Sequence, residues 1–394
     1  MKKITSNSDD TIPFDTQVEI LKKLPVKPLI KFRSVSKEYK SLIDSRIFIA
    51  EYGSRETHPN RLLVRYTQHK TPNVENYVCF LDNDDSNFTQ QEFAPRIPNA
   101  LTKLLNRLRI VGTSHGLLCF YGFNYSSNEN NMIILWNPSI RTSFGITLPG
   151  ELGWSCKDNV IGFGVCPVTS DPIVVKSRNL DGWEVEIFTL STGIWKRVPS
   201  TNIPSRESAE LTWHQIVINK LIYFLAYDKT VAVEPESDKT HIDESDDFLN
   251  LIVSFDMTTN EFTILDLPNN LAYRSEYLSM SKIRESLVVL EYNWDTYKSD
   301  CVVWMMMEQG VRNLFTKLFT INEDVCSVVG FMKNGDPMIV TEDNYDHSEP
   351  TALKVYDRCS QHFKQLGIYG EEDSFFMGSY VETLLLLDHP DCFI

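Results

Sequence analysis

Apolar residues near the start of the chain recur at roughly helical spacing in three short groups, within residues 18–24, 29–35 and 39–47. Pro25 follows the first group and ends its helix, because proline has no backbone N–H and restricts the residue before it. Ser36 precedes the third group, where its hydroxyl is suited to cap a helix. The pattern predicts three short helices.

A unit of about forty residues buries little surface and is only marginally stable alone. Apolar positions that stay uncovered in such a unit are expected to meet a partner. The alternative is a helical cap that packs on the main domain of the same chain.

The chain beyond about residue 60 contains a weak repeat in which a strand-like run ends in turn residues and a second strand follows. Copies recur about every fifty residues, except where an acidic insert, Glu234 to Asp247, stretches one step. Six copies fit a ring of six units, which is typical of a β-propeller; a two-sheet sandwich and an irregular open barrel are the alternatives. The copies begin at Cys79, Leu135, Ile187, Val253, Val302 and Lys354. The predicted fold class is therefore α + β, with a small three-helix unit followed by an all-β, propeller-like domain.

Charge is distributed unevenly along the chain. The whole sequence has 38 Lys and Arg against 53 Asp and Glu, but residues 11–55 contain nine basic and five acidic residues. A basic N-terminal unit suits an acidic protein surface, whereas the net charge of −15 disfavours binding to nucleic acid. No apolar stretch reaches membrane-spanning length, and Met1-Lys2-Lys3 leads into polar residues rather than a signal peptide. We expect a cytoplasmic or nuclear protein.

Sequence motifs for catalysis or metal binding are missing. The sequence has no GxSxG, GxxxxGK[ST] or HExxH motif, and its eight cysteines form no CxxC pair. Seven acids crowd the insert at 234–247, but without the glycine-centred spacing of a calcium loop; a solvated loop is the expected role. His115 precedes Gly116 in a tight turn and is expected to be structural. We expect no cofactor, no metal and no catalytic residue, although scattered carboxylates could still converge in a propeller channel.

The N-terminal unit, residues 8–54, resembles a plant-type F-box. The resemblance is carried by Ile12-Pro13 and by the run EILKKLPVKPLIKFRSVSKEYKSLI from Glu19. Two positions depart from the usual pattern, since Ile12 replaces leucine and Tyr39 stands where tryptophan is frequent. The resemblance implies docking on a Skp-type adaptor, and through it on cullin and RING subunits. The implied adaptor-binding residues are Ile12, Pro13, Leu21, Leu24, Pro25, Leu29, Phe32, Val35, Ser36, Tyr39 and Leu42.

Residues 60–394 resemble the F-box associated interaction domain of plants, which is kelch-like in repeat length. The segments that carry the resemblance include VGTSHGLLCF from Val111, LWNPSIRTSFGITLP from Leu135 and YVETLLLL from Tyr380. Together the two resemblances imply a non-catalytic adaptor of a Skp-cullin-F-box ubiquitin ligase, whose C-terminal domain binds a protein client for ubiquitination and proteasomal degradation. A scaffold that does not degrade its partner and a propeller enzyme are the alternatives. The sequence does not identify the client.

Overall fold

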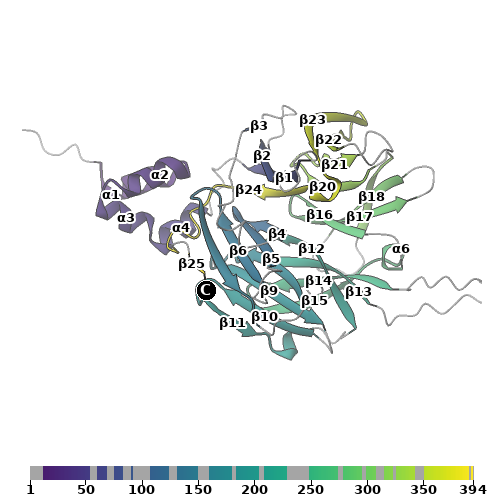
Figure 1. Cartoon of the computed structure of the whole chain (residues 1–394), viewed down its shortest axis with the longest axis horizontal. Helices are drawn as coiled ribbons and strands as arrows, with labels where there is room; N and C mark the ends of the chain where they lie inside the picture. The colour runs from purple at the N-terminus through teal and green to yellow at the C-terminus, as the bar shows by residue number, and fades with distance from the viewer. Residues whose placement is uncertain are drawn as a thin grey trace, which may run out of the picture.

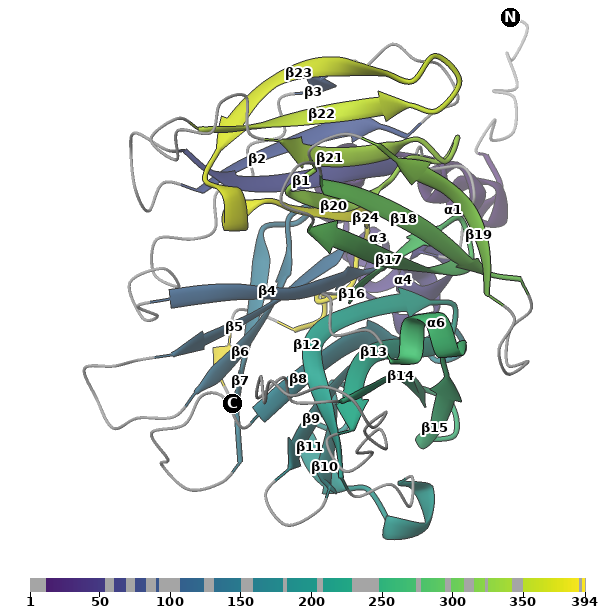
Figure 2. The same cartoon turned by 90° about the vertical axis from the view of Figure 1, so that its right-hand side faces the viewer.

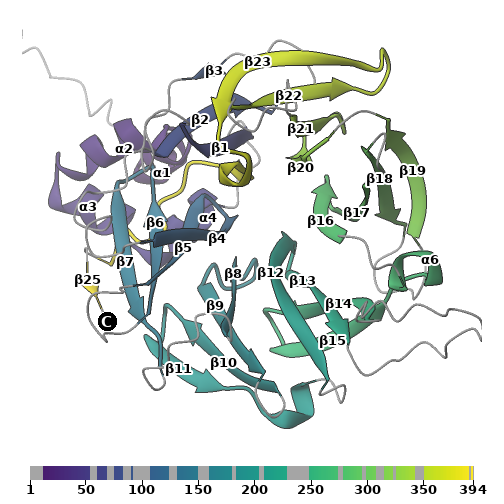
Figure 3. The ribbon, with the colours of Figure 1, turned by 45° about the vertical axis from the view of Figure 1, so that its right-hand side comes forward.

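The computed structural model describes residues 12–53, 60–68, 75–82, 90–91, 107–123, 131–149, 159–179, 183–203, 208–228, 248–273, 278–294, 299–307, 315–322, 325–341, 350–389 and 392–393. Within these ranges, four helices open the chain and the strands that follow form six sheets. The sheets stand side by side in a ring around a common axis, each as one blade of a propeller (Figure 3). The predicted fold class, helices followed by a six-unit β-propeller, is confirmed.

We number the blades 1 to 6 in chain order and give their strands from the axis outward. Blade 1 contains β24 (Phe376–Tyr380), β1 (Arg61–Thr67), β2 (Glu75–Leu81) and β3 (Gln90–Gln91). Blade 2 contains β4 (Arg107–Ser114), β5 (Leu117–Phe123), β6 (Met132–Asn137), β7 (Thr142–Thr147) and the short parallel strand β25 (Cys392–Phe393). Blade 3 contains β8 (Asn159–Val165), β9 (Pro172–Asn179), β10 (Trp183–Thr189) and β11 (Ile194–Arg197).

The other three blades follow the same order. Blade 4 contains β12 (Ala209–Ile218), β13 (Leu221–Asp228), β14 (Leu249–Asp256) and β15 (Glu261–Asp266). Blade 5 contains β16 (Leu278–Ile283), β17 (Ser286–Trp294), β18 (Ser299–Met306) and β19 (Phe315–Ile321). Blade 6 contains β20 (Ser327–Phe331), β21 (Pro337–Thr341), β22 (Thr351–Asp357) and β23 (His362–Gly370). Three short helices lie between strands: η1 (Ser200–Asn202), α6 (Asn269–Ala272) and η2 (Glu372–Ser374).

The ring is closed by strands from both ends of the propeller sequence. Strand β24 pairs with β1, with Leu63 opposite Gly378, and β1 pairs on its other side with β2, where Leu63 is opposite Cys79. Closure of this kind builds one blade from both ends of the propeller sequence and so fixes the first blade beside the last.

The repeat found in the sequence corresponds to the two outer strands of each blade. In three blades the turn between these strands begins with an Asn or Asp side chain that accepts a hydrogen bond from the backbone N–H two residues on. The donor and acceptor pairs are Ser139 N with Asn137 Oδ1 (2.9 Å), Thr258 N with Asp256 Oδ1 (2.8 Å) and Cys359 N with Asp357 Oδ1 (2.8 Å).

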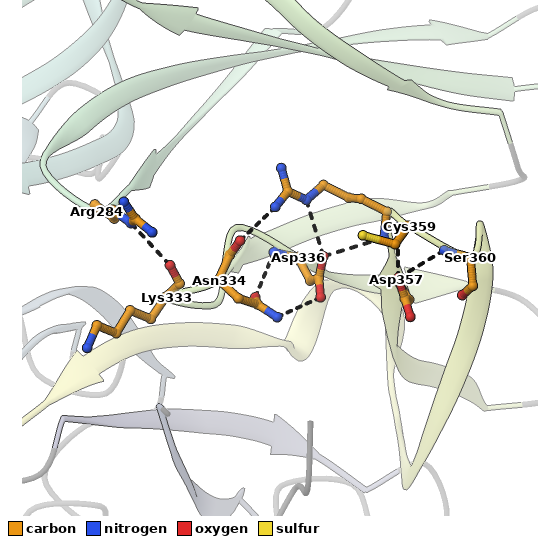
Figure 4. Close-up of polar contacts among 8 residues, drawn as sticks. Arg284, Lys333, Asn334, Asp336, Asp357, Cys359 and Ser360 are labelled. Atoms are coloured by element: carbon orange, nitrogen blue, oxygen red, sulfur yellow. Dashed lines mark hydrogen bonds and ion pairs between the residues drawn. The ribbon is translucent and has the colours of Figure 1, made fainter. Parts of the chain in front are cut away.

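Arginine side chains join two turns within blade 6 and join blade 6 to blade 5 (Figure 4). Arg358 donates from Nη2 to the carbonyl of Asn334 at 2.6 Å and from Nε to Asp336 Oδ1 at 3.2 Å. Arg284 Nε donates to the Lys333 carbonyl at 3.4 Å. The first two contacts hold the turns of blade 6 together, and the third connects this blade to blade 5.

The helices are α1 (Phe14–Lys22), α2 (Val26–Arg33), α3 (Lys37–Ile43) and α4 (Arg46–Gly53). The predicted third helix, which was expected to extend toward Ile47, instead stops at Ile43, and α4 is a separate helix. The Oγ atom of Ser45 accepts a hydrogen bond from Phe48 N at 3.3 Å and so favours a new helix start. We refer to residues 12–53 as the helical unit; it lies beside the propeller in Figure 1 and behind its strands in Figure 2.

The two faces of the propeller differ in their connections. Because neighbouring strands of a blade are antiparallel, the connections from first to second and from third to fourth strand lie on one face. The helical unit packs on this face, where α4 approaches Thr169–Pro172 and Leu190–Ser191 of blade 3. We call it the near face and the opposite one the far face.

Candidate functional site

The helical unit exposes a group of apolar side chains. Ile12 is 51% exposed, Phe32 40% and Val35 67%, and Pro13 and Phe14 are also exposed. We call these five residues the helical apolar surface. They come from the start of α1 and the end of α2, two places that short helices bring together. Exposed apolar groups of this size, grouped on a small unit, are typical of protein-binding surfaces.

A series of side-chain contacts through Tyr39 and Gln17 holds the helical apolar surface in place. The Tyr39 ring lies edge-on to Phe32, with centroids 6.3 Å apart, and its hydroxyl donates to Oε1 of Gln17. Gln17 in turn donates from Nε2 to the carbonyl of Ile12 at 2.6 Å. Tyr39 thus connects the apolar residues of α2 to the segment before α1.

The structure distributes the predicted adaptor-binding residues over three environments. Ile12, Pro13, Pro25, Phe32, Val35 and Ser36 are exposed; Leu24, Tyr39 and Leu42 are half-buried; Leu21 and Leu29 are buried in the core. Pro25 and Ser36 stand at the N-caps of α2 and α3, and Ser36 Oγ accepts from Tyr39 N at 3.1 Å. Leu21 and Leu29 therefore support the surface from beneath, and the assignment of the set to adaptor binding stays a prediction.

The charges around this surface are mainly positive. Lys22 lies 2.7 Å from carboxylate oxygens of both Glu19 and Glu51, and these hydrogen bonds raise the pKa of its ammonium. Arg33 is paired with Asp44, whose hydrogen bond raises the pKa of the guanidinium. Five further lysines are exposed and form no ion pair with another described residue: Lys23, Lys27, Lys31, Lys37 and Lys40. The surface is therefore apolar with a cationic border.

The helical unit is attached to the propeller by the segment that follows β24, residues 381–389. Glu382 accepts a hydrogen bond from Val26 N at 3.0 Å and pairs with Arg61 Nη1 at 3.1 Å. Pro25, the N-cap of α2, has no side-chain oxygen to satisfy this end of the helix, so Glu382 takes that role. Leu384, Leu385 and Leu386 of the same segment belong to one core with Leu29 and Phe48.

A pocket of about 320 Å³ lies where α4, blade 3 and segment 381–389 meet. Its carboxylates are engaged by neighbours: Asp171 accepts from Ser191 N at 2.9 Å, and Asp388 lies 3.8 Å from Arg46. This arrangement joins the two parts of the molecule and offers no pair of acids free for catalysis among its described lining residues.

His115, the histidine singled out in the sequence, lies in the turn between β4 and β5. Its Nδ1 is 3.1 Å from Ser114 Oγ, which accepts a hydrogen bond from Val165 N at 3.0 Å. Burial, and then the charge of Lys282, lower the pKa of the imidazole. These contacts fit the expected structural role.

The acidic insert, 234–247, lies outside the described residues. Among the described residues, no three His, Cys, Asp or Glu side chains are grouped to hold a metal ion. No described helix has the length and apolar character to cross a membrane.

Sequence reasoning missed Glu382, because nothing in the local pattern marks a partner 356 positions from Val26. The glutamate sits within the YVETLLLL run, which carried the family resemblance without indicating a contact to the helices.

Comparison with known families accounts for most of the chain. The F-box domain family matches residues 10–50, and the F-box associated beta propeller domain family matches residues 81–386. The chain is similar to putative F-box protein At1g47790 of Arabidopsis thaliana, with 25% identity over 69% of this chain and 63% of that protein. It is 28% identical to F-box protein CPR1 of the same plant, over 79% of this chain and 73% of that protein.

The chain spans 59% to 65% of the length of the first three curated relatives that it matches. Among solved structures, it resembles an acylaminoacyl peptidase of Pyrococcus horikoshii, with TM-score 0.39, 13% identity and coverage of 67% of this chain and 40% of that one. It resembles a puromycin hydrolase mutant with TM-score 0.43, 11% identity and coverage of 68% and 40%. These likenesses are too slight to bear on the chemistry of this chain.

Proposed function

The chain belongs to the family of proteins with an F-box associated beta propeller domain, here preceded by an F-box, and from this premise we propose that it is the substrate-recognition subunit of a Skp-cullin-F-box ubiquitin ligase. The observation that carries the proposal is the helical apolar surface with its cationic border. A Skp-type adaptor with an acidic, partly apolar face would cover these residues and link the chain to cullin and RING subunits.

The proposed mechanism is control of effective concentration. The helical unit holds the chain to the ligase while the propeller holds a client protein, so client lysines are kept near the charged ubiquitin-conjugating enzyme. The transfer chemistry belongs to that enzyme, and this chain supplies position. The rigid attachment through Glu382 and the shared leucine core supports this mechanism, because it fixes the direction in which the client is presented.

The far face of the propeller is the proposed client side. The helical unit occupies part of the near face, whereas the far face is directed away from it. Client choice by loops on a rigid scaffold is common for propellers. We retain the kelch-like repeat type, a cytoplasmic or nuclear location and the degradation of the client as parts of this proposal.

Adaptor capture tests the proposal most directly. The full chain is purified with a panel of plant Skp-type adaptors and compared with Val35→Asp and with Val168→Asp. Val168 is 78% exposed on the β8–β9 turn, so the two variants make the same change at two exposed valines. Val35→Asp is expected to lower the affinity for the adaptor by at least about tenfold, which is the loss expected at an interface hot spot. Val168→Asp is expected to bind the adaptor as tightly as the wild type does.

Equal capture of both variants, or no capture by any adaptor, would refute the proposed docking surface. A captured adaptor whose partner protein keeps a constant level with and without proteasome inhibition would instead favour a scaffold that does not degrade its partner.

A further inference from the structure

The innermost strands of the propeller have a charge balance opposite to that of the chain. Strands β4, β8, β12, β16, β20 and β24 contain three Lys or Arg and one Glu, whereas the whole chain has 38 against 53. The single acid, Glu210, accepts a hydrogen bond from the Tyr227 hydroxyl at 2.7 Å. The sequences of these strands therefore contain more basic than acidic residues, in an acidic protein.

One of these cations, Arg109 on β4, is held by an aromatic ring. Its guanidinium carbon lies 4.5 Å from the centroid of the Trp213 ring, which also stacks on Tyr121 at 5.5 Å. Tyr121 is the cross-strand partner of Arg109 on β5. A guanidinium that lies on an indole is oriented without using its N–H donors, which remain available for an acceptor.

Trp213, which contacts Arg109 and Tyr121 of blade 2, lies in an irregular part of β12. Leu211 pairs with Ala226 and Gln215 pairs with Phe224, so three residues of β12 oppose one residue of β13. The extra residues belong to the segment 212–214, which includes Trp213 and His214. Bulges in antiparallel sheets often redirect side chains at functional sites.

Hydrogen bonds tie the strand that carries this bulge to its neighbour. Gln215 accepts from Phe163 N at 2.8 Å and donates to the Phe163 carbonyl at 3.2 Å, which ties β12 to β8. A Cβ at Gly112 would lie 2.3 Å from Gln215 Nε2, so a larger residue there would displace the Gln215 amide from these hydrogen bonds. Arg109 and Trp213 are thus preorganised before any ligand arrives.

Arg109 forms no ion pair with a carboxylate among the described residues. Arg109 and His214 both retain solvent-exposed area, yet the protein around them lowers the pKa of each; for His214 the charge of Arg109 contributes after burial. An anion bound beside them would raise the pKa of both groups again, because a negative charge stabilises their protonated, charged forms.

Arg109 lies in the part of β4 nearer to the far face, since the strand runs from Arg107 toward the near-face turn at His115. The far face is the proposed client side.

We propose that Arg109, oriented by Trp213 and accompanied by His214, binds an anionic group of the client, a carboxylate or a phosphate. The inference rests on the proposed function for the identity of the ligand as a client, but the anion site itself does not depend on the adaptor. A guanidinium whose parallel donors are not paired with a described carboxylate fits both groups in bidentate fashion. The site would select clients that present an acidic or phosphorylated residue at the far face.

Anion binding is measured on the full chain without adaptor, by calorimetric titration with inorganic phosphate and, separately, with acetate at constant ionic strength. The variants are Arg109→Gln and, as a matched control, Arg284→Gln, which changes an exposed arginine in a near-face turn. Wild type and Arg284→Gln are expected to bind with equal affinity, and Arg109→Gln at least tenfold more weakly. Phosphate bound in preference to acetate assigns a phosphorylated client residue, and the reverse order assigns Asp or Glu.

Arg109→Lys and Trp213→Leu keep the result interpretable if Arg109→Gln folds poorly. The lysine keeps the charge without the fork of donors, and the leucine removes the ring that orients Arg109; both are expected to bind several-fold more weakly than wild type. Absence of anion binding by the wild type, or equal binding by all variants, would overturn the proposal. Failure of adaptor capture with intact anion binding would refute the proposed function and leave this site in place.

Discussion

Glu382 and Val26 are 356 positions apart in the sequence but are hydrogen-bonded to each other, with the glutamate carboxylate 3.0 Å from the backbone nitrogen at the start of α2. One side chain from the end of the propeller thereby caps a helix of the F-box, and its second oxygen is bound by Arg61. The two domains share this carboxylate, so their relative orientation depends on it.

Glu382→Ala is expected to lower the free energy of unfolding by about 1–2 kcal/mol, from a lost helix cap and a lost, partly buried ion pair. Hydrogen exchange should report the loss mainly in α1 to α3, because α2 loses its N-terminal partner. Glu261→Ala, at an exposed glutamate on β15, is the control and should leave this exchange unchanged. Equal protection of the helices in both variants would show that Glu382 does not fix the F-box.

Tyr39→Phe removes the hydroxyl that binds Gln17 and keeps the ring that contacts Phe32. The loss of one hydrogen bond costs about 0.5–1.5 kcal/mol. We expect this loss to lower the affinity for the adaptor rather than the melting temperature of the protein. Titration of the adaptor should show an affinity reduced several-fold. Tyr273→Phe, at a tyrosine that is 51% exposed on the propeller, provides the comparison; an identical affinity for both would exclude the positioning role of Tyr39.

Gly116 and Gly193 both have positive φ, +80° and +67°, but only the first is crowded. A Cβ at Gly116 would lie 2.1 Å from the Val381 carbonyl oxygen, whereas nothing lies within 4 Å of one at Gly193. Alanine at Gly193 should cost about 1–2 kcal/mol of unfolding free energy from backbone strain alone. Alanine at Gly116 should cost about 1–3 kcal/mol more, because segment 381–389 must move. Urea denaturation of the two variants measures the difference between their unfolding free energies. Equal values would show that segment 381–389 moves aside at no cost.

Stability should fall as the solution is acidified below about pH 6.5, the ordinary pKa of histidine. The pKa values of His115 and His214 are both lowered in the folded protein, chiefly because the surrounding protein desolvates the rings, although both side chains keep exposed area. The unfolded chain then binds more protons than the folded chain in this range, so the stabilisation present above the unfolded pKa is lost as pH falls through the folded values. Urea midpoints at pH 7.5 and 5.5 test this, and the double variant His115→Asn with His214→Asn should show a smaller decrease. An unchanged decrease would assign the acid sensitivity to other groups.

The sequence was informative where structure is local. The outer hairpins of the blades could be predicted because Asp256, Asp357 and Asn137 occupy turns whose hydrogen bonds span two residues. The end of the first helix was likewise marked by Pro25, and the start of the third by Ser36. The fourth helix was missed, since the break at Ser45 depends on one side-chain hydrogen bond within a continuous apolar pattern.

Long-range relationships were beyond the sequence pattern. The pairing of β24 with β1, the contact of Glu382 with Val26 and the meeting of Arg109 with Trp213 all follow from ring closure. None has a periodic signature, because each depends on where strands from distant parts of the chain stop. The candidate adaptor surface could therefore be predicted in outline, whereas the candidate anion site could not.

The closure of blade 1 by β24 also sets the order of events during translation. Strands β1 to β3 leave the ribosome long before residues 376–389, yet they cannot be completed as a blade until those residues arrive. The same residues supply Glu382 and the leucines beneath the F-box, so the two domains mature in one step. A chain arrested before this point would present neither a finished client domain nor a supported adaptor surface, which would keep incomplete products from competing for the ligase.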